Sequence, residues 1–120
     1  MLIKFIKTDF EFKDDRGTIT QLVHEGWKQV NYITTRAGVI RGNHYHKNNE
    51  EAFYIISGEF ELELFDINTK EKESHIIKSG DFFIIKRNLS HSFNFTKDTQ
   101  LISMYSNGVE EKDGMDIYTA

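Results

Sequence analysis

Two histidines two residues apart, followed by a pair of glutamates, are residues whose types and spacing could do chemistry. They lie in the stretch RGNHYHKNNEEAFYIISG, which begins at Arg41 and ends at Gly58. On a β-strand, His44 and His46 would leave the same face about 7 Å apart at Cα. At that spacing both imidazoles can bind one ion. Glu51 begins the apolar run that follows, so its carboxylate could face back toward the pair.

A third histidine lies in the later segment LSHSFNF. His91 alternates there with Phe93 and Phe95, and this period of two places all three side chains on the inward, apolar face of a strand. Three imidazoles and one carboxylate suit a first-row divalent metal ion, zinc before nickel, iron or manganese, with positions left open for water or substrate. The alternative is that a histidine pair followed by an acid is simply a polar loop or a strand edge.

The residues around these side chains predict an all-β fold. Proline is absent, phenylalanine, tyrosine and isoleucine are abundant, and apolar residues recur with a period of two. The clearest case is EFELELF, where Phe60, Leu62 and Leu64 fall on one face and glutamates on the other. Turn signals such as RAG, DINTK and SNG separate these runs about every eight to twelve residues, which is typical of a sandwich or barrel.

Length and composition limit the function further. The 120 residues predict one domain, 1–120, and without cysteine there is no disulfide framework, zinc-thiolate cluster or cysteine nucleophile. The net charge of −4 and the scattered basic residues argue against nucleic acid as a partner. The start MLIKFIKTDFEF is too short and too interrupted by charge for a signal peptide, and no apolar run is long enough to span a membrane. We therefore expect a cytoplasmic protein without membrane association.

The glycines extend the histidine pattern into a longer motif. Gly38 is followed after five residues by His44, one residue separates His44 from His46, four more precede Glu51, and six more precede Gly58. This spacing resembles the first motif of the cupin superfamily in every position.

The second cupin motif is similar to the segment from Gly80 to His91. Lys86 stands in place of its usual proline, Asn88 in place of its usual glycine, and Asn94 one residue before its usual asparagine. The resemblance implies a small double-stranded β-helix, or jelly-roll barrel, with its site in the barrel mouth. It also implies one divalent metal ion held by four residues, His44, His46, Glu51 and His91. The alternative is a cupin that keeps these residues for acid–base or binding work without metal.

Two further stretches resemble nucleotide-sugar cupins. FKDDRGTITQL is similar to their Asp-x-Arg-Gly segment, and GVIRGNHYH to their Arg-Gly-x-His-x-His strand. These cupins include the dTDP-4-keto-6-deoxyhexose 3,5-epimerases, the WxcM-like 3,4-ketoisomerases, and the zinc-binding cupin domain of capsular polysaccharide enzymes that epimerise UDP-linked keto-sugars. The last group is the most similar, although its members carry a reductase domain that this sequence lacks.

Isomerising or epimerising a 4-keto-sugar requires a base beside the carbon next to the carbonyl and an electrophile that stabilises the enolate. His44 stands where the rhamnose-pathway epimerases carry their catalytic histidine, and a metal in the same cluster could polarise the keto oxygen. The two roles compete, because an imidazole nitrogen that binds metal cannot accept a proton. Tyr105 is a candidate acid, or else an ordinary core aromatic.

Arg16 and Arg41 are candidate ligands of a substrate diphosphate, because a guanidinium binds phosphate through two hydrogen bonds. Each could instead be a solvated turn or edge charge. We also expect a homodimer, since a small barrel has exposed edge strands, and the alternating segment MLIKFIKTDFEF could add to a neighbour's sheet.

Three functions remain open at this point. The first is an epimerase or isomerase of nucleotide-linked keto-sugars in the synthesis of cell-surface polysaccharide, which is favoured because two arginines suit a diphosphate. The second is a cupin oxygenase or another small-molecule metalloenzyme, which would use the same histidines without the arginines. The third is a sugar-binding module without catalysis.

Overall fold

The computed structural model describes residues 1–112 and 114–119, and every element in them is a β-strand. No helix in this described part of the chain is long and apolar enough to cross a membrane. The strands are β1 (Lys4–Phe5), β2 (Phe10–Asp14), β3 (Gly17–Gln21), β4 (Gln29–Thr35), β5 (Ile40–Tyr45), β6 (Glu51–Ser57), β7 (Glu59–Asp66), β8 (Lys72–Lys78), β9 (Phe82–Ile85), β10 (Leu89–Phe95), β11 (Thr99–Tyr105), β12 (Glu110–Glu111), β13 (Gly114–Met115) and β14 (Tyr118–Thr119).

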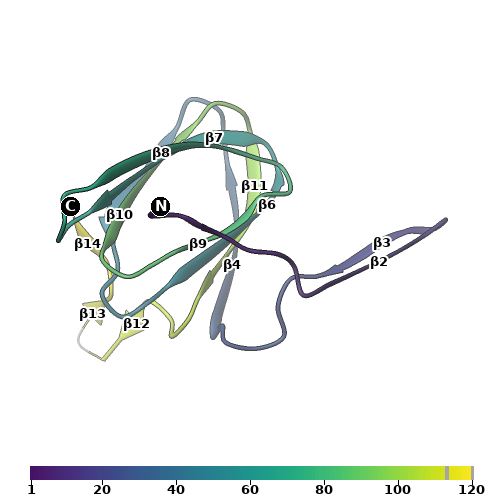
Figure 1. Ribbon diagram of the computed structural model, residues 1–120, viewed down its shortest axis with the longest axis horizontal. Helices are drawn as coiled ribbons and strands as arrows, with labels where there is room; N and C mark the ends of the chain where they lie inside the picture. Colours follow the sequence, from purple (N-terminus) through teal and green to yellow (C-terminus); the bar gives the residue numbers. More distant parts are fainter. Residues whose placement is uncertain (113, 120) are drawn as a thin grey trace.

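Two five-stranded antiparallel sheets face each other and form the barrel (Figure 1). The first sheet has the order β1-β9-β6-β11-β4, and the second has the order β14-β5-β10-β7-β8. Most neighbours in each sheet are distant in sequence, as expected for a jelly-roll in which the chain passes repeatedly from one sheet to the other. The predicted all-β jelly-roll is therefore confirmed.

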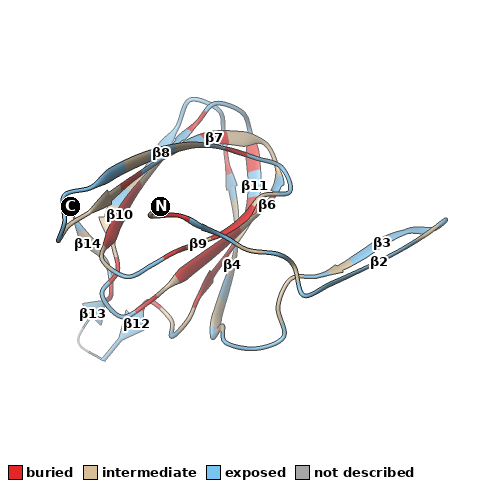
Figure 2. Cartoon of the chain, in the orientation of Figure 1, coloured by how far each residue is buried: buried red, intermediate tan, exposed pale blue. Residues whose placement is uncertain are grey.

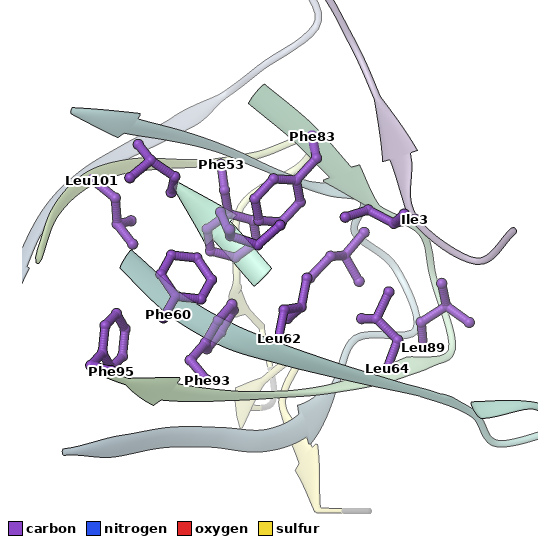
Figure 3. Close-up of a cluster of buried hydrophobic side chains, with 13 residues drawn as sticks. Ile3, Phe53, Phe60, Leu62, Leu64, Phe83, Leu89, Phe93, Phe95 and Leu101 are labelled. Atoms are coloured by element: carbon purple, nitrogen blue, oxygen red, sulfur yellow. The ribbon is translucent and has the colours of Figure 1, made fainter. Parts of the chain in front are cut away.

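The main core fills the space between the two sheets. Figure 2 shows buried residues in red on β6, β10 and β11. The aromatic side chains and leucines of the core interdigitate across the gap in Figure 3. The alternation predicted for β7 is observed, because Phe60, Leu62 and Leu64 are buried while Glu61 and Glu63 are exposed. β7 thus contributes every second side chain to the core.

A second apolar cluster covers the outer face of the first sheet. Ala52, Phe82 and Met104 are buried there, and the segment from Leu22 to Trp27 packs over them. Trp27 is therefore part of this outer cluster. This segment connects the hairpin formed by β2 and β3 to β4 of the barrel.

The β2–β3 hairpin stands away from the barrel (Figure 1). Its strands pair only with each other among the described residues. Phe10, Phe12 and Ile19 on this hairpin are exposed. By contrast, the first residues of the chain join the barrel, because Ile3 is buried in the core and β1 pairs with β9.

Candidate functional site

Three histidines meet inside one end of the barrel. His44 lies on β5, His91 lies opposite it on β10, and the two are direct partners across the sheet. His46 lies just beyond the end of β5, not within a strand as the sequence pattern suggested. A ring nitrogen from each of the three lies within 4.8 Å of the others. The spacing that predicted convergence of these side chains was therefore informative.

An irregularity in β5 orients the site. Asn43 has φ of 61° and Gly42 has φ of 96°, and the register between β5 and β10 shifts at this point. A shift of one residue reverses which side chains face inward. As a result Arg41 and His44, three residues apart, both line the same cavity. Gly42 is required here, because a Cβ at this position would lie 2.6 Å from the carbonyl oxygen of His91.

Glu51 supplies the carboxylate of the cluster from the first residue of β6. It is 4% exposed, and its Oε1 lies 3.1 Å from Nε2 of His46 and 3.6 Å from Nε2 of His91. The Ser103 hydroxyl donates a hydrogen bond of 2.7 Å to the other carboxylate oxygen. The four residues predicted from the first and second motifs therefore gather in one place.

Hydrogen bonds at the Nδ1 atoms direct the Nε2 atoms of two histidines into the cluster. Nδ1 of His46 donates to the carbonyl oxygen of Asp116 at 2.5 Å, and Nδ1 of His91 donates to the carbonyl oxygen of Leu89 at 3.1 Å. A carbonyl oxygen can only accept, so both Nδ1 atoms carry a proton. Nε2 of His91 is buried and has no hydrogen-bond partner among the described residues.

The pKa shifts indicate which members of the cluster carry charge. Burial, and then the charge on His46, lower the pKa of His44, and burial lowers the pKa of His91 to about 4. Burial alone would lower the pKa of His46, but its hydrogen bonds to Glu51 and Asp116 raise it. Burial would raise the pKa of Glu51, but the hydrogen bond from His46 and the nearby histidines lower it. His44 and His91 are therefore neutral, and His46 and Glu51 form a charged pair.

Tyr105, the candidate acid, lies beside this cluster. It is the last residue of β11, and its ring packs edge-on against His46 with 5.1 Å between ring centres. Burial, and then the negative charge of Glu51, raise the pKa of Tyr105 above its ordinary value. The residue therefore keeps its proton at neutral pH. Its side chain also lines the cavity, so it is more than a core aromatic.

A cavity of about 470 Å³ extends from this cluster to Arg41. His44, Glu51, His91 and Tyr105 line one end. Its remaining walls are mostly apolar and come from both sheets, with Ile33, Phe53, Phe93, Phe95 and Leu101. Nε of Arg41 donates a hydrogen bond of 2.8 Å to Thr35 on β4, so this side chain bridges the two sheets.

Arg16, the other predicted diphosphate ligand, is not brought to this cavity. It lies in the turn between β2 and β3, where its side chain is 82% exposed. It binds Asp14 through Nε at 2.9 Å and through a second nitrogen at 2.6 Å. The structure thus places the two arginines in different regions of the molecule.

The turn of the second motif keeps its shape despite its unusual residues. Asn88, which replaces the usual glycine, has φ of 64°. Asparagine tolerates this left-handed conformation better than most residues. The backbone N–H of Asn88 donates to the carbonyl oxygen of His46 at 2.8 Å. The turn therefore holds the position of His46.

Sequence reasoning missed three residues that support the site, namely Ser103, Asn49 and Asp116. Ser103 could have been found, because it precedes Tyr105 by two residues on a strand and therefore faces the same side. Asn49 and Asp116 are buried and hydrogen-bonded to each other at 2.8 Å, although 67 residues separate them. No local pattern indicates a contact over that distance.

The donor set fits a divalent metal ion. The unpaired Nε2 of His91 lies 3.6 Å from a carboxylate oxygen of Glu51, and two such acceptors are satisfied by a cation between them. Nitrogens bound to one tetrahedral zinc lie about 3.3 Å apart, given zinc–nitrogen bonds of about 2.0 Å. His44, His46, Glu51 and His91 are therefore able to hold one ion.

Comparison with known proteins identifies the family. Residues 12–118 match the family model described as the polysaccharide biosynthesis C-terminal domain. The chain belongs to this family. A relative of this polysaccharide biosynthesis domain is the spore coat polysaccharide biosynthesis protein SpsL of Bacillus subtilis (strain 168). SpsL is 23% identical over an alignment of 113 residues, which covers 83% of this chain and 75% of SpsL.

Two solved structures show the same fold as this polysaccharide biosynthesis domain. QdtA, a sugar 3,4-ketoisomerase from Thermoanaerobacterium thermosaccharolyticum in complex with TDP, superposes with a TM-score of 0.78 at 20% identity, covering 99% of this chain and 88% of QdtA. The capsular polysaccharide assembling protein CapF from Staphylococcus aureus superposes with a TM-score of 0.68 at 21% identity, covering 92% of this chain and 33% of CapF. The predicted resemblance to nucleotide-sugar cupins is confirmed at the level of fold.

Proposed function

We propose that this domain isomerises or epimerises a nucleotide-linked 4-keto-sugar in the synthesis of a cell-surface polysaccharide. The observation that carries the proposal is the cavity that joins a histidine–glutamate cluster to Arg41. Membership of a polysaccharide biosynthesis family and the fold shared with QdtA support it. The cytoplasm, where nucleotide-sugars are made, is the proposed location.

The cavity has the dimensions and lining that such a substrate requires. Arg41 and His44 lie on β5 opposite Phe93 and His91, which are two residues apart on β10, so they are separated by about 7 Å along the strand. A sugar ring beside His44 would therefore carry its diphosphate to the guanidinium of Arg41. The apolar wall between them suits the methyl group of a 6-deoxy sugar. It also excludes water, which strengthens electrostatic stabilisation of an enolate.

Two neutral residues, His44 and Tyr105, can transfer the proton that the isomerisation requires. His44 has an unprotonated ring nitrogen at neutral pH because its pKa is lowered, so it can accept a proton from the carbon next to the keto group. Tyr105 keeps its proton and can donate it to the enolate oxygen or carbon. Without a metal ion, Glu51 and His46 form a charged pair that contributes to the electrostatic field of the site.

We also propose one divalent metal ion, zinc in the first place, held by His44, His46, Glu51 and His91. When bound, such an ion supplies a Lewis acid for the keto oxygen. His44 cannot serve as base at the nitrogen that binds the ion, so a residue outside the four ligands would then have to accept the proton, while Tyr105, which keeps its own proton, would act as the acid. Elemental analysis of protein purified without an affinity tag should find one ion per chain. A well-folded protein that stays free of metal after incubation with zinc, nickel, iron or manganese would exclude this part of the proposal.

The reaction is tested by exchange of sugar protons with solvent. The protein is incubated in deuterated water with dTDP- and UDP-linked 4-keto-6-deoxyhexoses, and the C3 and C5 protons are followed by NMR. We expect loss of the signal from one or both protons, and no loss with His44→Gln. His24→Gln is the matched control, because His24 is exposed and lies outside the cavity.

The two other functions would give different results in binding, exchange and oxygen-consumption assays. Tight binding without exchange or turnover would support a sugar-binding module. Oxygen consumption with a small organic substrate, in the absence of binding to any nucleotide-sugar, would support a metal-dependent oxygenase. Either result would replace the proposed isomerase.

We further propose that the domain is a homodimer and that the β2–β3 hairpin contacts the second copy. A two-stranded hairpin is marginally stable alone, and this one exposes Phe10, Phe12 and Ile19. β4, at the edge of the first sheet, exposes Val30 and Tyr32, which offers an apolar surface of the same kind. We predicted from the sequence that MLIKFIKTDFEF contacts the second copy. Because β1 pairs with β9 of its own barrel, the proposed dimer contact now involves only the second half of this segment.

Arg16 can then bind substrate only in the cavity of the second copy, because it lies on the hairpin away from its own cavity. Mixing Arg16→Ala dimers with His44→Gln dimers tests this arrangement. Exchanged dimers would contain one intact site, and random exchange would restore about one quarter of the wild-type sites. No recovery after verified exchange would place Arg16 outside catalysis. A monomer at micromolar concentration, measured by sedimentation, would exclude the dimer.

A further inference from the structure

A buried hydrogen-bond network lies beside His46, on the side of its Nδ1 atom. Asp116 is fully buried in the C-terminal segment that precedes β14. Its Oδ1 accepts the backbone N–H of Lys47 at 2.9 Å, and its Oδ2 accepts the backbone N–H of Asn48 at 2.8 Å. Oδ2 also accepts the side-chain amide of Asn49 at 2.8 Å. One carboxylate therefore fixes the three residues that follow His46.

The main chain of the same residue contacts His46 itself. The carbonyl oxygen of Asp116 accepts the hydrogen bond from Nδ1 of His46, and its N–H donates to the carbonyl oxygen of Val109 at 2.8 Å. The two contacts use the peptide groups on either side of the Asp116 Cα, so a change in the backbone dihedrals of Asp116 would move one or both out of position. The carboxylate contacts with the 47–49 loop prevent that change, because they attach the side chain to the segment that carries His46.

Asn49 connects the same hydrogen-bond network to the segment that contains Asn107 and Gly108. Its Oδ1 accepts the backbone N–H groups of Asn107 and Gly108, both at 2.9 Å, and its amide donates to the carbonyl oxygen of Gly108. All polar atoms of the Asn49 side chain are thus paired with the C-terminal segment. A fully paired buried network of this kind specifies one arrangement of the chain.

We propose that Asp116 is the positioning residue that sets the tautomer and orientation of His46. With Nδ1 committed to the Asp116 carbonyl, the Nε2 atom is the one that faces Glu51 and the cavity. A histidine that binds a metal or exchanges a proton needs its second nitrogen fixed in this way. The inference rests on the proposed function only in taking His46 as a site residue.

The first test measures the tautomer of His46 without substrate or metal. Long-range ¹H–¹⁵N NMR of labelled protein at alkaline pH, where the ring is neutral, reports which nitrogen carries the proton. We expect the Nδ1–H tautomer alone in the wild type and a mixture of tautomers in Asp116→Asn, whose amide N–H₂ cannot accept from both loop N–H groups. His46→Gln assigns the signal.

Asp66→Asn is the matched control. Asp66 also accepts two backbone N–H groups in a turn, from Asn68 at 2.8 Å and Thr69 at 3.1 Å, but it does not line the cavity. We expect it to leave the tautomer of His46 unchanged. If Asp116→Asn does not fold, Asp116→Ser keeps one acceptor in a smaller side chain and should give the same mixture.

The second test measures zinc affinity by calorimetry. Loss of a group that orients a metal-binding histidine commonly lowers metal affinity about 10- to 100-fold, and we expect that range for Asp116→Asn and no change for Asp66→Asn. An Asp116→Asn protein with the Nδ1–H tautomer alone and wild-type zinc affinity would overturn the inference. If Asp116→Asn shows the mixture of tautomers while the wild-type protein has no activity on nucleotide-sugars, only the proposed function would be contradicted.

Discussion

The site end of the barrel and the β2–β3 hairpin are built in opposite ways. At the site, His46, Glu51 and His91 are nearly inaccessible, and Asn49 and Asp116 pair their polar atoms with backbone from distant segments. In the hairpin, apolar side chains are exposed, and Arg16 pairs with Asp14, two residues away.

This difference separates a region that the chain fixes by itself from one that a second copy would fix in the proposed dimer. Buried, mutually paired groups have one arrangement, so the histidine cluster is preorganised in the single chain. The hairpin has few contacts with its own barrel, and in the proposed dimer it would gain stability from contacts with the second copy.

Replacing His91 by leucine should separate function from stability. We expect proton exchange to fall at least about 1,000-fold, because a cluster residue is lost. The free energy of unfolding of the metal-free protein should stay the same or rise by about 1 kcal/mol, because a buried nitrogen without a partner is removed. Urea unfolding and the NMR exchange assay measure the two quantities. A strongly destabilised protein would mean that His91 is a structural residue.

His24→Leu is the matching change at the base of the hairpin. His24 pairs with Asp9 and is 65% exposed, so the exchange rate should remain near that of the wild type. Equal losses in both variants would remove the contrast between the two regions.

Replacing Gly42 by alanine should lower stability by about 3 kcal/mol, through a strained φ and a clash with the backbone of His91. Gly17→Ala in the hairpin should cost less, about 1 to 2 kcal/mol, since no atom lies within 4 Å of the added Cβ and only the φ of 140° opposes it. Chemical denaturation of both variants gives the difference. Similar values for the two would show that the bulge in β5 is not rigid.

Replacing Arg41 by alanine should weaken binding of a nucleotide-sugar by about 1.5 to 3 kcal/mol, the range for a lost charged hydrogen-bonding partner. Because Arg41 belongs to its own cavity, the loss should be the same in dimer and monomer. Arg16→Ala should weaken binding only where the dimer is intact. Calorimetric titration with TDP, on the wild-type background and on a monomeric Phe12→Asp background, distinguishes the two arginines.

Glu73 attaches the N-terminus to the barrel through a pH-dependent contact. It accepts the backbone N–H groups of Leu2 at 2.8 Å and Ile3 at 2.9 Å, and it pairs with His75 at 2.6 Å. Burial would raise the pKa of Glu73, but the hydrogen bonds from His75, Ile3 and Leu2 outweigh burial and lower the pKa to about 2.

The Glu73 contact should therefore stabilise the protein above the ordinary pKa of 4.5 and lose its effect as the pH falls toward 2. Glu73→Gln should lower stability by about 1 kcal/mol at neutral pH, and the difference from wild type should disappear in acid. Thermal unfolding across this pH range measures it, with the exposed Glu61→Gln as control. A difference independent of pH would exclude the ionised carboxylate as the cause.

Much of the barrel could be predicted from the sequence because burial has a period of two along each strand. The inward position of His91 follows from its alternation with Phe93 and Phe95, and Glu51 begins β6 as expected. The alternation fails at Gly42 and Asn43, where a register shift interrupts it. Strict alternation would place Arg41 and His44 on opposite faces of the strand, so the period of two alone did not predict that both would line the cavity.

The supporting residues of the site could not be predicted for a different reason. Asp116 contacts the loop after His46 through hydrogen bonds that span about 70 residues of chain, and such contacts leave no periodic pattern. The position of Arg16 was also beyond prediction, because a hairpin of alternating residues looks the same whether it covers its own barrel or projects from it. The roles of the site residues, the metal and the dimer remain predictions.

The contact between Asp116 and His46 also sets the order in which the protein can be finished during synthesis. The chain leaves the ribosome from the N-terminus, and domains fold as their residues emerge. The β5, β6, β10 and β11 strands can pair before the C-terminal segment is free, but His46 acquires its hydrogen-bond partner only afterwards. A nascent chain arrested before Asp116 emerges would therefore hold a barrel in which Nδ1 of His46 lacks its hydrogen-bond partner, and emergence of the segment around Asp116 would complete the orientation of this histidine.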